Sequence, residues 1–151
     1  HMNFSHNYEK YNDDDIEYVD YFAILTGREE VPQVYTLDTA LATFQSQDNS
    51  DLKFSVKITE MSKIKQVNID IGKSSEREEI VAELYKSETP SEEVTGKLCE
   101  GDISSQDLKG QLEGKDTKEL LRKIEHGKAY VNILTEDKPN GKIRGKIKKL
   151  S

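Results

Sequence analysis

The sequence predicts an all-β protein, an antiparallel β-sandwich of Ig-like or Greek-key barrel-like type with one short helix near residues 117–126. Three observations predict this fold. Short segments alternate apolar and polar residues with period two, turn-forming residues recur between them, and a single segment has helical spacing. The 151 residues suffice for one domain with a substantial hydrophobic core.

The first residues do not share this pattern. Residues 1–17 are polar and aperiodic, so we expect a flexible tail there and assign the domain to residues 18–151. The initial His1-Met2 is typical of tag cleavage, and we expect a signal peptide or anchor to have been removed with the natural N-terminus. The run Asp13-Asp14-Asp15 can bind calcium, but it lacks the D-x-D-x-D-G spacing of a calcium loop, which favours a solvated tail.

Three strands are expected in the first part of the domain. The segment "DYFAILTG" opens it, and "TLDTALATFQSQ" gives a second strand that ends at the turn residues Asp48-Asn49-Ser50. The clearest alternation is in "DLKFSVKIT", which predicts one buried and one solvated face. Its inward-facing residues are Leu52, Phe54, Val56 and Ile58.

Three further strands follow in the middle of the chain. In "KQVNIDIG" the alternation places Gln66, Asn68 and Asp70 on the outward face, opposite Val67, Ile69 and Ile71. In "EIVAELYK" it predicts burial of Ile80, Ala82 and Leu84. The segment "TGKLCEGDIS", after Pro90, is expected to be another strand.

The segment "DTKELLRKIEHGK" has helical spacing. Leu120, Leu121 and Ile124 fall on one side of a helix over about 117–126. Asp116 and Glu119 have the spacing of a capping box, with Asp in place of the usual Ser or Thr. The following Gly127 suits the left-handed position after a helix.

The chain ends in a predicted hairpin, "KAYVNILTEDKPNGKIRGKIKKL", with its loop around residues 136–140. A glycine inside the second arm, Gly145, indicates close approach of a neighbouring backbone or side chain. The residues expected to pack inward are Ala129, Val131, Ile133, Ile143 and Ile147.

Three ordered motifs carry a family resemblance. "FAILTGREEVPQV", "GDISSQDLKGQL" and "LLRKIEHGKAYVNILTEDKPNGKIRGKI" together resemble the CHRD domain, which is named for the BMP inhibitor chordin and also occurs in bacteria and archaea. The similarity covers residues 20–149. It implies an antiparallel β-sandwich, usually in secreted or surface-exposed proteins. Microbial members generally have no assigned activity, and in chordin the domain belongs to an extracellular protein that binds growth factors.

The chain departs from that family at three positions. The family often has A-H-I-H where this chain reads Val67-Asn68-Ile69-Asp70, and V-N-V-H-T where it reads Val131-Asn132-Ile133-Leu134-Thr135. By strand parity the three family histidines lie on outward faces, and a shared polar or metal cluster is one use that the resemblance allows. Here the positions hold Asn68, Asp70 and Leu134, and the loop that follows is the charged "KSSEREE". Any function that depends on those imidazoles is therefore expected to be absent.

Composition excludes several classes of function. The formal net charge of −7 argues against general nucleic-acid binding, which needs a basic face. No apolar run approaches the ~20 residues of a membrane span. The single cysteine, Cys99, excludes an internal disulfide and a zinc knuckle, and we expect it to be a small packed residue.

Neither catalysis nor metal binding has a clear signature. His126 lies at the expected helix end, His1 and His6 lie in the tail, and no known catalytic motif is found. Asn68 and Asp70 can contribute to a calcium site, but calcium needs 6–8 oxygen ligands, which favours an ordinary polar sheet face. We therefore predict no cofactor, no metal and no enzymatic activity.

Arg144 stands between apolar positions of a strand, where an unpaired buried charge is costly. Its planar fork suits a carboxylate. We predict a structural ion pair with Glu30 of "REEVP", which would join the start of the chain to its end. A ligand carboxylate held by Arg144 is the functional alternative.

The hairpin also gives the candidate contact surface. Tyr130, Asn132 and Leu134 share an outward face, and Tyr85 is assigned to another. With Asn68 and Asp70 they form the predicted binding surface for a protein partner, unless a second layer, a loop or the tail covers them.

The sequence thus predicts a non-enzymatic extracytoplasmic domain for binding or adhesion at a cell surface, with homo-oligomerisation an open option. One alternative is a calcium- or copper-associated surface protein of the same fold. A third, weaker alternative is an enzyme that uses carboxylates.

Overall fold

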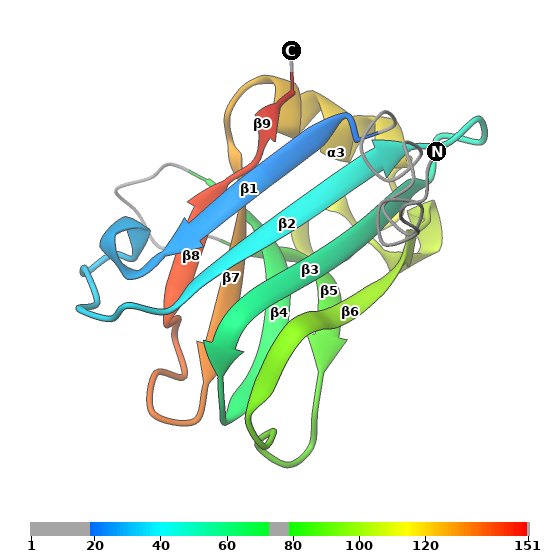
Figure 1. The fold of residues 1–151 in the computed structure, drawn as a ribbon. Coiled ribbons are helices and arrows are strands. Elements are labelled where there is room, and N and C mark those ends of the chain that lie inside the picture. Colours follow the sequence, from blue (N-terminus) through cyan, green and yellow to red (C-terminus); the bar gives the residue numbers. More distant parts are fainter. Residues whose placement is uncertain (1–18, 73–78, 151) are drawn as a thin grey trace, which may run out of the picture.

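The computed structural model describes residues 19–72 and 79–150, so the predicted tail with Asp13-Asp14-Asp15, His1 and His6, and most of the "KSSEREE" loop, lie outside the described residues (Figure 1). The strands are β1 (Tyr21–Thr26), β2 (Thr39–Ser46), β3 (Leu52–Met61), β4 (Ile64–Ile71), β5 (Glu79–Lys86), β6 (Val94–Ile103), β7 (Ala129–Thr135), β8 (Ile143–Lys146) and β9 (Lys148–Lys149). The helices are the α-helix α3 (Thr117–Glu125) and the 3₁₀ turns η1 (Gly27–Glu29), η2 (Ser105–Asp107) and η3 (Gly110–Leu112).

The described strands form one nearly closed, barrel-like antiparallel sheet. Its order is β5-β4-β7-β8-β1-β2-β3-β6, and β9 also pairs with β1. The all-β antiparallel class with one short helix is therefore as predicted, whereas two separate sheets of a sandwich are not seen in the described residues. The reason is β8, which pairs with β7 on one side and, through Arg144 and Thr26, with β1 on the other. It thereby joins the two halves into one sheet.

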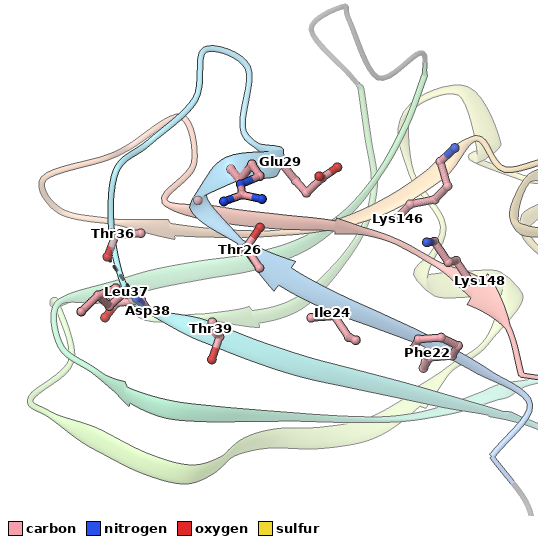
Figure 2. A pocket seen from close by; sticks show the side chains of 12 residues that line it. Phe22, Ile24, Thr26, Glu29, Thr36, Leu37, Asp38, Thr39, Lys146 and Lys148 are labelled. Atoms are coloured by element: carbon pink, nitrogen blue, oxygen red, sulfur yellow. Dashed lines mark hydrogen bonds between the residues drawn. The ribbon is translucent and has the colours of Figure 1, made fainter.

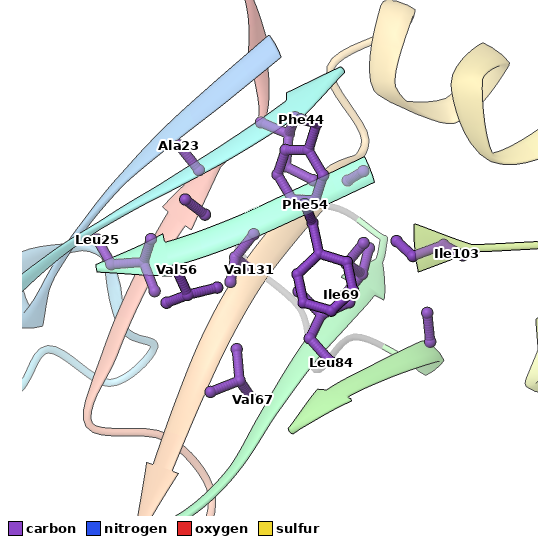
Figure 3. Close-up of a cluster of buried hydrophobic side chains, with 14 of the residues drawn as sticks. Ala23, Leu25, Phe44, Phe54, Val56, Val67, Ile69, Leu84, Ile103 and Val131 are labelled. Atoms are coloured by element: carbon purple, nitrogen blue, oxygen red, sulfur yellow. The ribbon is translucent and has the colours of Figure 1, made fainter. Parts of the chain in front are cut away.

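The period-two pattern correctly predicted which face of the central strands is buried. The predicted inward residues of the central strands, among them Val56, Val67 and Val131, are fully buried. Figure 3 shows their side chains meeting those of Leu25 and Phe44 between the two halves of the sheet. These aliphatic and aromatic side chains make one continuous core, which is the main source of the fold's stability.

The prediction for β5 was wrong at one residue. Ala82 and Leu84 are buried as expected, but Ile80 is only half-buried and Val81 takes its place in the core. The register explains this difference, because Ile69 pairs with Ala82 while its neighbour Asp70 pairs with Ile80. Val81 is thus the extra residue of a β-bulge, and it reverses the parity of the residues before it.

The α-helix begins and ends where the sequence predicted. The Asp116 side chain accepts a hydrogen bond from the Lys118 N–H at 2.9 Å, while Glu119 pairs with Arg122 instead of completing the capping box. At the other end Gly127 has φ 71°, and the bonds from Gly127 N and Lys128 N to the helix carbonyls form a Schellman motif. The buried Leu120 and Ile124 fasten the helix to one end of the sheet (Figure 1).

Candidate functional site

Three polar side chains form a row across the face of the sheet opposite the core. Asn68 of β4 lies directly beside Asn132 of β7, and Asn132 lies directly beside Arg144 of β8. Strand alternation puts them outside the core, as predicted, yet their exposed fractions are only 1%, 8% and 3%. Something outside the sheet must therefore cover them.

The cover comes from two loops, the β1–β2 loop (residues 27–38) and the β7–β8 loop (residues 136–142). Between them lies a hollow of about 320 Å³, which we call the polar recess. Its lining residues are Glu30, Val31, Pro32, Asn68, Asp70, Ile80, Asn132, Leu134, Pro139, Asn140 and Arg144. The two loops provide mainly apolar walls, and the strands provide a polar floor.

Most residues of the predicted binding surface are buried. Asn132, Asn68 and Asp70 are buried at the recess between the two loops, and Tyr130 is buried with Arg144 over its ring. The predicted surface is therefore covered, which was the alternative left open, and does not form an open flat patch. Leu134 is half-buried and lines the recess. Tyr85 does not line it, because the register shift at Leu84 sets Tyr85 opposite Val67 and against the core.

The two asparagine side chains are held in fixed orientations. The Asn68 Oδ1 accepts from Gln66 Nε2 at 2.7 Å, and Gln66 Nε2 also donates to Glu83 Oε2 at 3.0 Å. The Asn132 Nδ2 donates to the Asn140 carbonyl at 3.3 Å. The other two amide atoms, the donor Asn68 Nδ2 and the acceptor Asn132 Oδ1, are buried and have no hydrogen-bond partner among the described residues.

Arg144 is held by several contacts. Its Nη1 donates to the Glu29 carbonyl at 2.8 Å, and its guanidinium lies 4.1 Å from the centre of the Tyr130 ring, a cation–π distance. Glu30 is also buried and lines the same recess. The two predicted partners are thus brought to one site, and the ion pair between them stays a prediction.

Gly141 fits the β7–β8 loop closely onto this site. A Cβ added there would lie 2.5 Å from Glu30 Oε1 and 2.7 Å from Asn132 Oδ1, and the residue has φ 137°. Only glycine suits both the conformation and the space. The loop therefore lies directly against the glutamate and the asparagine that line the recess.

The other chemical groups singled out from the sequence lie elsewhere. Within the described ranges, no three His, Cys, Asp or Glu side chains gather as a metal-binding group. His126 is the C-cap residue of α3, and Cys99 packs against the core, where burial raises the pKa of its thiol to about 11. A thiol with so high a pKa is a weak nucleophile at neutral pH because little thiolate forms.

A second hollow, the outer groove, follows the outward face of β1. Its volume is about 510 Å³, and Figure 2 shows Phe22 and Ile24 on its floor with Lys146 and Lys148 on one side and Leu37 on the other. Ile24 is 58% exposed, so this groove is open, and its lining mixes a few apolar side chains with more polar and charged ones. The polar recess is the better candidate site because its polar groups are buried and fixed.

Several recess residues were missed by sequence reasoning. Val31 and Pro32 belong to the motif "EEVP", but nothing in the sequence indicated that this loop lines one hollow together with side chains of β4 and β7. Pro139 and Asn140 were assigned only to a hairpin loop. Ile80 was assigned to the core, and the one signal of the bulge that turns it outward is the apolar Val81 at a position that the alternation assigns to the outward face.

Comparison with known proteins gives one match. A family model described as "CHRD domain" matches residues 21–147. No curated protein and no solved structure matches the chain. A helix long and apolar enough to cross a membrane is not found in the described part of the chain.

Proposed function

Because the chain belongs to the CHRD domain family, we propose that it is an extracytoplasmic binding or adhesion domain whose binding site is the polar recess. This family is of extracellular binding type, which supports a non-enzymatic role for the chain. Its partner is a component of the cell surface or its surroundings. The observation that carries this proposal is the pair of buried amide atoms, Asn68 Nδ2 and Asn132 Oδ1, which have no partners among the described residues. Their residues are direct partners in the register of β4 and β7, and both line the recess. Buried polar atoms without partners are uncommon, and a ligand would satisfy them.

The family resemblance supports the same place. The three positions where the family often has histidine are Asn68, Asp70 and Leu134 in this chain, and all three line the recess. Asn68 and Asp70 lie on β4, and Leu134 lies on β7, far from them in sequence. Their convergence in one hollow is what a shared binding site would require, with side chains that differ between members.

The recess is preorganised for recognition. The Asn68 amide is fixed by Gln66, the Asn132 amide by the Asn140 carbonyl, and Arg144 by the Glu29 carbonyl and the Tyr130 ring. Since these groups are held before a ligand enters, little conformational entropy is lost on binding.

Binding is tested with purified cell envelope from the source organism and labelled protein. The Leu134→Arg variant places a long charged side chain in the recess, while Leu41→Arg makes the same change on an exposed face of β2 outside it. We expect Leu134→Arg to lose at least tenfold in envelope binding and Leu41→Arg to bind like the wild type. Equal binding by all three folded proteins, with folding verified by circular dichroism, would remove the recess as the site.

The extracytoplasmic location is tested separately. Intact cells that produce the natural protein are treated with an external protease, and we expect the protein to be degraded while a cytoplasmic marker survives. Survival of both proteins until the cells are lysed would contradict the location.

A further inference from the structure

The two buried amide atoms without partners specify what a ligand must present. A group that lies between them must accept a hydrogen bond from Asn68 Nδ2 and donate one to Asn132 Oδ1. The two residues are direct partners in the antiparallel register, so their Cβ atoms are about 4.5–5.5 Å apart. One small group can therefore reach both side chains.

The donor and the acceptor cannot exchange roles. A flip of the Asn68 amide would turn its donor group toward Gln66 Nε2, and a flip of the Asn132 amide would turn its oxygen toward the Asn140 carbonyl. Each flip replaces a hydrogen bond by a contact between like groups. The polarity of the pair is therefore fixed.

A hydroxyl is the group that both accepts and donates through one atom. A carboxamide offers an acceptor and a donor too, but on two atoms, and so needs more width between the side chains. Around the asparagines the recess has apolar walls from Pro32, Leu134 and Pro139, which suit the C–H faces of a ring. Its volume of about 320 Å³ matches about ten water molecules at ~30 Å³ each, which is room for one sugar ring with its hydroxyls.

We propose that the polar recess binds one polyhydroxylated unit, a sugar residue of a surface glycan or a free sugar, with one hydroxyl bridging Asn68 Nδ2 and Asn132 Oδ1. This inference rests on the proposed function, because it names the ligand class of the same site. The adhesion partner is then a carbohydrate.

The test follows the side-chain amide signals of Asn68 and Asn132 by NMR in ¹⁵N-labelled protein, with the exposed Asn49 amide as an internal reference. Probes are glucose, galactose, mannose, N-acetylglucosamine and myo-inositol, then oligosaccharides released from the envelope, with acetamide and N-methylacetamide as the amide arm. We expect saturable shifts of Asn68 and Asn132 with at least one sugar, at dissociation constants on the order of 1–10 mM for a single ring. Tighter binding of the oligosaccharides would identify a glycan chain as the source.

The matched variants are Asn68→Leu, which removes the recess donor, and Gln106→Leu, which makes a similar change at an exposed residue outside the recess. We expect Asn68→Leu to weaken sugar binding at least tenfold and Gln106→Leu to leave it unchanged. Asn68→Leu should also unfold at about the same temperature as the wild type. It loses the bond from Gln66 Nε2, which keeps Glu83 as a partner, but it also removes a buried donor without a partner. If Asn68 has a purely structural role, the variant instead melts at a lower temperature.

Three outcomes would overturn the inference. Saturable shifts with the amides and none with the sugars would point to a peptide ligand. No saturable shift with any probe up to 100 mM would mean that the asparagines hold water only, and undiminished sugar binding by Asn68→Leu would place the sugar elsewhere. In each case the sugar is rejected as the ligand. If Leu134→Arg still loses at least tenfold in envelope binding, the proposed function of the recess nevertheless stands.

Discussion

Gly145 lies where β8 passes closest to β1. A side chain there would point directly into the backbone carbonyl of Ile24, and its φ is not of the kind that favours glycine for conformational reasons. Glycine is therefore required at position 145 for steric reasons alone. The alternating pattern had indicated a close approach at this residue, and the neighbour is a backbone group that cannot move aside independently of β1.

We expect Gly145→Ala to destabilise the protein by about 3 kcal/mol, the upper part of the usual range for overpacking, because two backbones must separate. The melting temperature should fall by about 6–12 °C in calorimetry. The control is Gly101→Ala, whose new Cβ would lie 3.2 Å from the edge of the Phe54 ring, a side chain that can shift. Equal melting temperatures for the two variants would show that the backbone contact is not limiting.

At the level of single residues, sequence reasoning succeeded where one rule decides the outcome. Strand parity placed Val67, Ile69 and Val131 in the core because burial of apolar side chains dominates the choice of face. It failed for Ile80 and Tyr85, since each lies beside a bulge, and a bulge adds a residue without changing the local composition. For Asn68 and Asn132, parity gave the outward face correctly but left open whether a loop covers them, and the structure shows them buried.

Helix α3 depends on its N-cap. The first N–H groups of a helix have no partner within it, and the Asp116 carboxylate satisfies that of Lys118. We expect Asp116→Ala to cost about 1 kcal/mol of unfolding free energy, and Asp116→Asn to cost little, because Asn caps as well as Asp. Urea denaturation measures both changes. We expect the slope of the unfolding free energy against urea concentration to stay unchanged. Equal losses for both variants would mean that charge, not capping, is what matters.

A side-chain hydrogen bond joins α3 to the sheet. The Tyr21 hydroxyl of β1 donates to Glu125 Oε2 of α3 at 2.7 Å. Burial, and then the hydrogen bond and the charge of Glu125, raise the pKa of Tyr21 from 10.0 to about 12. The neutral phenol is thus favoured in the folded state, and its contribution to stability is fully present below about pH 10 and lost as the pH rises toward 12.

Tyr21→Phe should therefore be less stable than the wild type by about 1 kcal/mol at pH 8, the value of an ordinary hydrogen bond. The difference should shrink as the pH rises from 10 to 12. Urea denaturation of both proteins across this range measures the difference, and lysine titration common to both cancels. A constant difference at all pH values would contradict the raised pKa of Tyr21.

Among the elements, those with a regular period were predictable. The helix was located to within one residue by its apolar spacing, Asp116 and Gly127, because these signals are local. The position of the β1–β2 loop was not predictable, since its approach to the polar residues of β4 and β7 depends on contacts between segments far apart in the sequence. The recess that this loop helps to form could therefore not be predicted, although the polar residues of its floor had been singled out from the sequence.

At the scale of the whole molecule, Arg144 connects segments from both ends of the fold. It pairs with Thr26 in the sheet, donates to the Glu29 carbonyl and lies near Glu30 in the same recess. A buried charge of this kind is stable only when it is paired and hydrogen-bonded. The predicted ion pair with Glu30 would complete that requirement.

A double-mutant cycle of Glu30→Gln and Arg144→Gln tests the pair. Each single change should cost about 3–5 kcal/mol, because it leaves a buried charge, and the double change should cost at least ~1 kcal/mol less than the sum. The exposed pair Lys97–Glu100, at 2.8 Å, is the matched control and should couple by at most ~1 kcal/mol. Additive losses at Glu30 and Arg144 would show that the two side chains do not form the pair.

The closure of the sheet was the least predictable feature at this scale. Alternation shows which face of a strand is buried, but not which strand lies next to it. Both a two-sheet sandwich and a closed sheet bury the same residues, so the pattern cannot separate them. Only the pairing of β8 and β9 with β1 decides between them.

That pairing has a consequence for how the protein is made. β1 leaves the ribosome early, but its partners on one side, β8 and β9, are synthesised more than a hundred residues later, since Arg144 and Glu29 are 115 positions apart. Until then one edge of β1 is open to the wrong strand or to another chain, and contacts so distant in sequence form slowly. The nascent domain therefore depends on a late, single docking event, and a helper that shields β1 would increase the yield of native protein.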